Sequence, residues 1–217
     1  GDQSCPSYSA TAPTNDPSGM AEVYDFTFSQ YSPWTRNWRF YQDVTNTDPS
    51  TGLLRTGQNT APFGVEPLTF MRLRINMAEL SGVTQTDTRK ILQYTTDTTG
   101  CNPNTAENTC TWTDVGDTDD TGAVWRYATT AETCAGCGDG ATSSTSRLTG
   151  TNQSTPVVVF VADKDAVADS DFDHTALNVA ELDFPLYAQK AVTGTTYYFR
   201  LYEPSLNKAG MDTPVFR

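Results

Sequence analysis

Apolar and polar residues alternate in several segments after residue 20, and this period of two is typical of a half-buried β-strand. The longest such segment is LTFMRLRINMAEL, residues 68–80. We expect its apolar residues to face a core and its polar residues to face solvent. The inward set is Met71, Leu73, Ile75 and Met77, and the outward set is Arg72, Arg74 and Asn76.

Similar patterns predict strands along most of the chain, separated by turn-forming segments such as NTDPSTG and DTDDTG. Residues 157–164, VVVFVADK, do not alternate and are rich in β-branched residues, so we expect burial on both faces. No helical pattern competes with these strands. The sequence therefore predicts an all-β fold, an antiparallel β-sandwich of Ig-like or jelly-roll-like type. The predicted strands are residues 38–44, 68–80, 89–96, 111–116, 124–130, 157–164, 177–189 and 196–204.

The N-terminal part has a different composition. Residues 1–20 are rich in Ser, Thr and Pro, which predicts a flexible leader that starts at a processed, mature end. Residues 21–34 are predicted to form an N-terminal strand, and residues 35–217 the sandwich domain. The strand is either the first strand of its own domain or completes the sheet of a neighbouring subunit. Its aromatic residues share one face: Tyr24, Phe26 and Phe28.

The charge of the chain excludes two classes of partner. The formal net charge is −12 and the pI is about 4.3, so the chain repels nucleic-acid phosphates and anionic lipid. The longest apolar run, PVVVFVA at residues 156–162, is too short to span a bilayer. We therefore expect no nucleic-acid partner and no membrane insertion.

The cysteines point to structural disulfides. The chain has five cysteines, and neither a haem anchor nor a thioredoxin-like helix accompanies the CAGC stretch. Four of the cysteines could supply the thiolates of a zinc site, but the usual pair of CxxC motifs is absent, so zinc is the less favoured alternative. We expect two bridges in an oxidising compartment, paired either within each short loop or across the two loops. The four residues are Cys101, Cys110, Cys134 and Cys137.

Cys5 is left over from this pairing. It is either a free thiol or an intermolecular bridge that links the leader to a neighbouring subunit.

An acidic stretch raises the question of a metal. Asp169, Asp171 and Asp173 alternate like the first ligands of a calcium loop, but the following positions do not fit an EF-hand. A different kind of Ca²⁺ loop is one hypothesis, and a solvated acidic loop is the simpler one. His174, the sole histidine, is expected at the surface among these acids. No other cofactor is predicted.

Enzymatic activity is not expected. A glycosidase needs two converging carboxylates, and Glu79, Glu181 and Glu203 lie in or near strands without a pattern that pairs them. A sugar-stacking platform would need exposed aromatic rings, whereas we expect most tryptophans to pack in the core. The tryptophans are Trp34, Trp38, Trp112 and Trp125. Asn152 begins the sequon NQS in a Thr/Ser-rich loop and is a candidate glycosylation site.

From about residue 35, a series of motifs resembles a family of secreted bacterial surface domains. The motifs, in order, are TRNWRFYQD, NTAP, FMRLRINMAELSG, RKILQYTTDT, WTDVG with VWRY, and ELDFPLYAQKAVTGTTYYFRLYE. That family carries a motif like QNHYRWRNDD, a strand like LRLRINIAN and a final TYYFRL strand. The chain departs at the first motif, where RNWRFYQD replaces the His-Tyr-Arg-Trp pattern. The resemblance implies an exported β-sandwich on cell surfaces and appendages, without catalytic residues to carry over.

Together these features predict a structural role outside the cell. We expect a self-assembling subunit of an extracellular, pilus-like filament or surface layer, joined by strand complementation. The alternative is a surface adhesin or carbohydrate-binding module with glycans as partners. A glycoside hydrolase is the weakest alternative.

Overall fold

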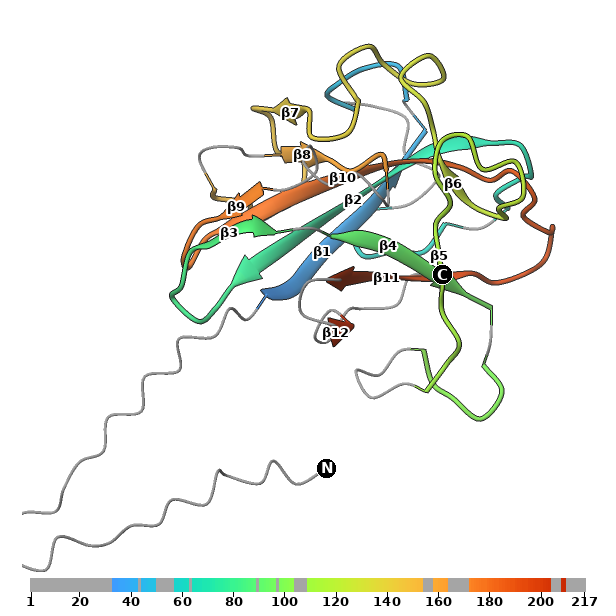
Figure 1. Cartoon of the computed structure of the whole chain (residues 1–217), viewed down its shortest axis with the longest axis horizontal. Coiled ribbons are helices and arrows are strands. Elements are labelled where there is room, and N and C mark those ends of the chain that lie inside the picture. The colour runs from blue at the N-terminus through green and yellow to red at the C-terminus, as the bar shows by residue number, and fades with distance from the viewer. Residues whose placement is uncertain are drawn as a thin grey trace, which may run out of the picture.

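The structure is a computed structural model of the whole chain (Figure 1). It describes residues 33–42, 44–49, 57–62, 64–88, 90–96, 98–103, 109–153, 158–163, 172–203 and 208–209. The predictions for Cys5, Asp169 and Asp171 and for the N-terminal strand with Tyr24, Phe26 and Phe28 lie outside these residues.

The described residues form an all-β fold, as the sequence predicts, with three sheets and no helix in those ranges. The largest sheet has the strand order β1-β2-β10-β8-β7, and β6 pairs with β10. Its strands are β1 (Pro33–Tyr41), β2 (Phe70–Glu79), β6 (Arg126–Tyr127), β7 (Thr142–Ser143), β8 (Val158–Phe160) and β10 (Val179–Tyr187).

Two smaller sheets complete the described part. One has the order β12-β11-β4-β5, and the other pairs β3 with β9. Their strands are β3 (Gln85–Thr88), β4 (Ile91–Thr95), β5 (Thr113–Asp114), β9 (Phe172–His174), β11 (Tyr198–Glu203) and β12 (Lys208–Ala209).

One hydrophobic core joins the six-stranded and the four-stranded sheet. Side chains from β1, β2 and β10 pack in a single cluster with side chains from β4 and β11. The ring of Phe40 in β1 lies edge-on to the ring of Phe199 in β11, with centroids 6.3 Å apart. The alternating residues of β2 that were predicted to face inward all belong to this cluster: Met71, Leu73, Ile75 and Met77.

Every predicted strand after residue 35 overlaps a strand of the structure, and VVVFVADK contains β8, which is buried as expected. The fully antiparallel arrangement is wrong, however, because β8 pairs with β10 in parallel. Between them the chain passes through β9, which pairs with β3 in a different sheet. That excursion lets β10 re-enter the large sheet in the direction of β8.

The predicted solvent face of β2 is also wrong. Arg72, Arg74 and Asn76 are completely buried, although they do point away from the hydrophobic core. The large sheet is therefore buried on both faces along β2, and its second face holds charged groups.

Candidate functional site

Pairing between β2 and β10 brings opposite charges together on one face of the sheet. In the antiparallel register Arg74 lies opposite Asp183, and Asn76 lies opposite Glu181. Residues paired in this way point to the same face of a sheet. The side chains of Arg72, Arg74, Glu181 and Asp183 thus share the face turned away from the apolar core, and all four are buried.

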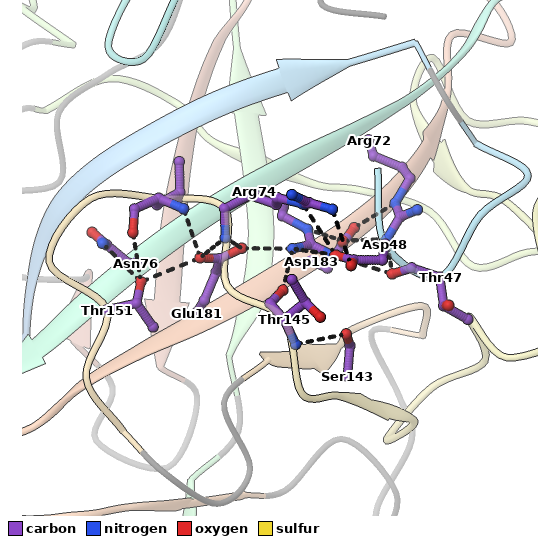
Figure 2. A network of polar contacts seen from close by, with 12 residues as sticks. Thr47, Asp48, Arg72, Arg74, Asn76, Ser143, Thr145, Thr151, Glu181 and Asp183 are labelled. Carbon is purple, nitrogen blue, oxygen red and sulfur yellow. Dashed lines mark hydrogen bonds and ion pairs between the residues drawn. The ribbon is translucent and has the colours of Figure 1, made fainter. Parts of the chain in front are cut away.

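The two arginines bind two carboxylates in a connected set (Figure 2). Asp183 accepts hydrogen bonds from Arg72, with Nε at 3.0 Å, and from Nε of Arg74. Glu181 accepts a hydrogen bond from Nη1 of Arg74 at 2.8 Å. We call Arg72, Arg74, Glu181 and Asp183 the ionic network. Its formal charge is balanced, which buried charges require.

Two loops close over the ionic network from different parts of the chain. Arg72 and Arg74 both donate to the carbonyl oxygen of Thr47, at 3.1 Å in each case. Arg74 also donates to the carbonyl oxygen of Thr145 at 3.1 Å. Figure 2 shows these loop residues around the charged side chains. The loops at residues 44–49 and 143–151 are thereby fixed to the sheet.

The carboxylate of Glu181 binds backbone amides of the loop that follows β7. Its Oε2 atom accepts hydrogen bonds from the amides of Arg147 and Leu148, both at 3.0 Å, and from the hydroxyl of Thr151 at 3.2 Å. Burial alone would lower the pKa of Arg74, but Asp183 and Glu181 raise it above its usual value. The network is a scaffold whose charges are all engaged.

Glu79, at the end of β2, also binds loop amides through its carboxylate. Its carboxylate accepts hydrogen bonds from the amides of Ser81, Gly82 and Leu177, at 2.7, 2.9 and 3.1 Å. Burial would raise the pKa of Glu79, but these hydrogen bonds lower it. Glu79 and Glu181 are therefore each occupied by a different loop, and Glu203 lies at the end of β11.

His174 is not at the surface, contrary to the sequence-based expectation. Its side chain is completely buried in β9, and Nε2 lies 3.1 Å from the carbonyl oxygen of Asn178. Burial lowers the pKa of His174 to about 4 and that of the buried Lys90 to about 7. Alternation along β9 explains the error, because the neighbouring Asp173 is the exposed residue. No metal-binding group of three side chains occurs within the described ranges.

The disulfides pair within each short loop. Cys101 bonds to Cys110, and Cys134 bonds to Cys137. Cys134 and Cys137 pack against Phe160 of β8 in a small cluster of their own. The alternative pairing across the two loops is thus excluded. Two disulfides indicate an oxidising, non-cytoplasmic environment.

The tryptophans do not form a common exposed platform. Trp38 and Trp125 are in the core, with 6% and 3% of their surface exposed. The guanidinium of Arg200 lies 4.3 Å from the ring centroid of Trp112. Trp34 in β1 is 44% exposed. Only Trp34 among the four offers an open aromatic face.

Two polar side chains in connecting segments, Asn152 and Asp120, bond to nearby backbone amides. Asn152 is exposed, as a glycosylation acceptor must be, and its Oδ1 accepts a hydrogen bond from the amide of Val179. In the DTDD turn, Asp120 accepts hydrogen bonds from the amides of Gly122 and Ala123 at 2.8 and 3.1 Å. Asp120 thus stabilises its own turn.

A pocket of about 380 Å³ opens between the two large sheets, and sequence reasoning missed it. Aromatic rings from three strands or strand ends form its floor, with Trp125 packing edge-on against Phe199 at 5.1 Å and against Tyr197 at 5.4 Å. Further lining comes from residues 61–62, 64–65 and 191–196. Nε1 of Trp125 is buried, and no described residue accepts a hydrogen bond from it. The pocket is apolar with one unsatisfied donor in its wall.

Beside this pocket the four-stranded sheet is incomplete. Strand β4 pairs with β11 over Tyr198–Tyr202, whereas β12 pairs with β11 only at Tyr202 and Glu203. In the part of the chain that the structure describes, no strand pairs with the other edge of β11 along residues 198–201. We call this stretch the free edge of β11. Figure 1 shows β12 as a short arrow beside the longer β11.

Comparison with known proteins adds no family. No protein-family model matches the chain, and no significant match to a curated protein or a solved structure was found.

A search for membrane-spanning helices gave none in the described segments.

Proposed function

We propose that this protein is a structural subunit of an extracellular filament or cell-surface layer, and that subunits join by β-strand complementation through residues 21–31. The single observation that carries the proposal is the free edge of β11, which has no strand partner beside residues 198–201 among the residues that the structure describes. An edge of this kind binds an added strand through backbone hydrogen bonds. The segment AEVYDFTFSQY has the alternation that such a strand needs.

The rest of the domain is cross-connected in a way that suits a subunit under mechanical tension. The ionic network fixes two loops to the large sheet, and two disulfides close two further loops. A subunit in a polymer must keep its shape when its neighbours pull on it, and such cross-connections restrict local opening. We take the two large sheets as a β-sandwich of the surface-domain type that the sequence motifs resemble.

The alternative is a binding module, either an adhesin or a carbohydrate-binding domain. The exposed Trp34 is the feature that favours it, because a flat aromatic face can stack on a sugar ring. A glycoside hydrolase gains no support from Glu79 and Glu181, since both carboxylates are occupied by loop amides.

Electron microscopy of material sheared from producing cells tests the proposal, with mass spectrometry to identify the subunit. We expect fibres or sheets in which this chain is the main component. Deleting residues 1–31 should leave a folded protein that no longer assembles. Recovery of the full chain only as a monomer that binds a glycan array would contradict the proposal and favour the binding module.

A further inference from the structure

Resting on the proposed strand complementation, we infer that residues 24–28 of a second copy bind antiparallel to the free edge of β11, with Phe28 and Phe26 in the aromatic pocket. Strand complementation itself does not say where the acceptor lies. We infer the acceptor from the position of the pocket, and the antiparallel register from the faces and charges of the two strands.

The acceptor follows from the position of the pocket. Tyr197 and Phe199 line it; Tyr197 directly precedes β11, and Phe199 is its second residue, beside the free edge. A strand added to that edge would direct every second side chain toward the core, on the face of Phe199 and Leu201. The pocket volume of about 380 Å³ is at the small end for ligand sites, which suits amino-acid side chains.

The register follows from matching the faces of the two strands. In an antiparallel pair that sets Phe26 opposite Phe199, Phe28 lies opposite Tyr197 and Tyr24 lies opposite Leu201. All the aromatic residues of the segment then face the core, because Phe199 and Leu201 belong to the core and Tyr197 packs against it. The same register sets Asp25 opposite Arg200 on the outer face.

Charge supports this register. Arg200 donates to Oε1 of Gln93 at 2.8 Å and stacks on Trp112, but it forms no ion pair within the described residues. Burial lowers the pKa of Arg200 to about 10, so a carboxylate beside it would favour its charged form. Asp25 is the acidic residue between the first two aromatic residues of the segment.

A second copy, not the same chain, fits the reach of the segment. Phe40 lines the pocket and lies seven residues along β1 from Pro33, a distance of about 23 Å. Phe28 precedes Pro33 by only five residues, which span at most about 18 Å even when fully extended. The chain would also have to reverse direction before β1. Phe28 of the same chain would enter the pocket only from a fully extended chain without that reversal, so a second copy fits the geometry better.

Cross-linking tests the inference in the full chain. Phe28→Cys in an isotope-labelled protein is mixed with Thr196→Cys in an unlabelled one, both with Cys5→Ser, after light scattering has confirmed that each self-associates. Thr196 is exposed and lines the pocket. We expect a disulfide-linked peptide that joins residue 28 of a labelled chain to residue 196 of an unlabelled chain.

The other outcomes overturn the inference in distinguishable ways. Self-association without this cross-link would place the acceptor elsewhere and leave the proposed function standing. A link within one chain, in the double variant Phe28→Cys/Thr196→Cys at high dilution, would show that the strand completes its own domain. Absence of self-association in the unmodified chain would remove the proposed function as well.

Blocking variants supply a second readout. Thr196→Trp should weaken self-association about tenfold or more, because the bulky ring fills a pocket that anchors the partner. Thr113→Trp is the matched control, since Thr113 is exposed in β5 at the opposite edge of the same sheet. Asp25→Arg should weaken assembly, and Arg200→Asp in the partner should restore it. Equal effects of both tryptophan variants, with unchanged melting temperatures, would contradict the inference.

Discussion

The ionic network and the free edge of β11 differ in how completely their polar groups are satisfied. The network is buried beside the large sheet, and each of its charged side chains bonds to another member of the network. Arg72, Arg74 and Glu181 also bond to loop atoms. The free edge of β11 leaves backbone groups of residues 198–201 without a strand partner in the described part of the chain. Unsatisfied groups beside an apolar pocket mark a surface for association, whereas a satisfied network marks internal support.

Removing a carboxylate from the network should have the largest effect on stability. Asp183→Ala leaves two buried guanidinium groups without their shared partner, so we expect a loss of about 3–5 kcal/mol in the free energy of unfolding. Urea unfolding followed by circular dichroism measures it. Asp48→Ala is the control, because Asp48 is partly exposed, bonds to Arg147 at 3.0 Å and lies farther from Arg74, at 3.9 Å, so its loss should cost less than about 1 kcal/mol. Equal losses in the two variants would contradict the distinction between buried and peripheral charges.

Acid should weaken the fold through His174. The pKa of His174 is lowered by burial from 6.5 to about 4, so the unfolded chain binds a proton that the folded chain rejects. Keeping His174 neutral in the folded state contributes fully to the free energy of unfolding above about pH 6.5. This contribution is lost as the pH falls toward 4, and it totals at most roughly 3 kcal/mol. Lys90, whose folded pKa is about 7, acts mainly above this window.

The control for this prediction is His174→Gln, which should flatten the dependence of stability on pH between 4 and 6.5 relative to the unmodified protein. Unfolding free energies measured across that range would contradict the account if the variant and the unmodified protein kept the same slope.

The disulfides should contribute less, and unequally. The Cys101–Cys110 bridge closes the longer loop, with a sequence separation of 9 against 3 for Cys134–Cys137. Replacing both cysteines by alanine should cost about 2–3 kcal/mol for the first pair and about 1–2 kcal/mol for the second. Calorimetry of the two double variants measures the order, and a larger loss for the second pair would show that burial of Cys137 dominates over loop length.

Trp34→Ala should have the smallest effect. Its ring is exposed in β1, outside both the network and the pocket, so we expect a change within about 0.5 kcal/mol in stability and none in self-association. Loss of glycan binding in this variant, measured on an array with the unmodified protein as reference, would instead favour the binding-module alternative.

The sequence predicts the strands of the fold well because alternation is a local signal. The inward face of β2 follows from alternation, and the double burial of β8 follows from its absence in a run of β-branched residues. Four of the described strands were not predicted: β3, β7, β9 and β12. They have two to four residues each, which are too few to display a period. Their pairing depends on distant segments.

The network could not be predicted from charge alone. Because charged residues are usually exposed, Arg72 and Arg74 were wrongly predicted to face solvent. Their partner Asp183 lies 111 and 109 residues further along the chain, so the local pattern does not reveal it. One signal was present: Glu181 and Asp183 alternate in the predicted strand 177–189 as the arginines do in 68–80. Complementary alternation in two strands indicates that they pair with their charged faces together.

The pocket had a weaker signal. Alternation in the predicted strand 196–204 places Tyr197, Phe199 and Leu201 on one face. The lining by Trp125 and by residues 61–62 and 64–65 requires the fold. The incomplete edge of β11 is a property of pairing, which no single segment reveals.

The most direct test of the account is an electron cryo-microscopy map of the assembled full chain. We expect a continuous strand beside β11, contributed by the neighbouring subunit, with an aromatic ring in the pocket between Trp125 and Tyr197. A map in which residues 24–28 pair with strands of their own subunit, or in which the free edge of β11 faces solvent between joined subunits, would contradict it.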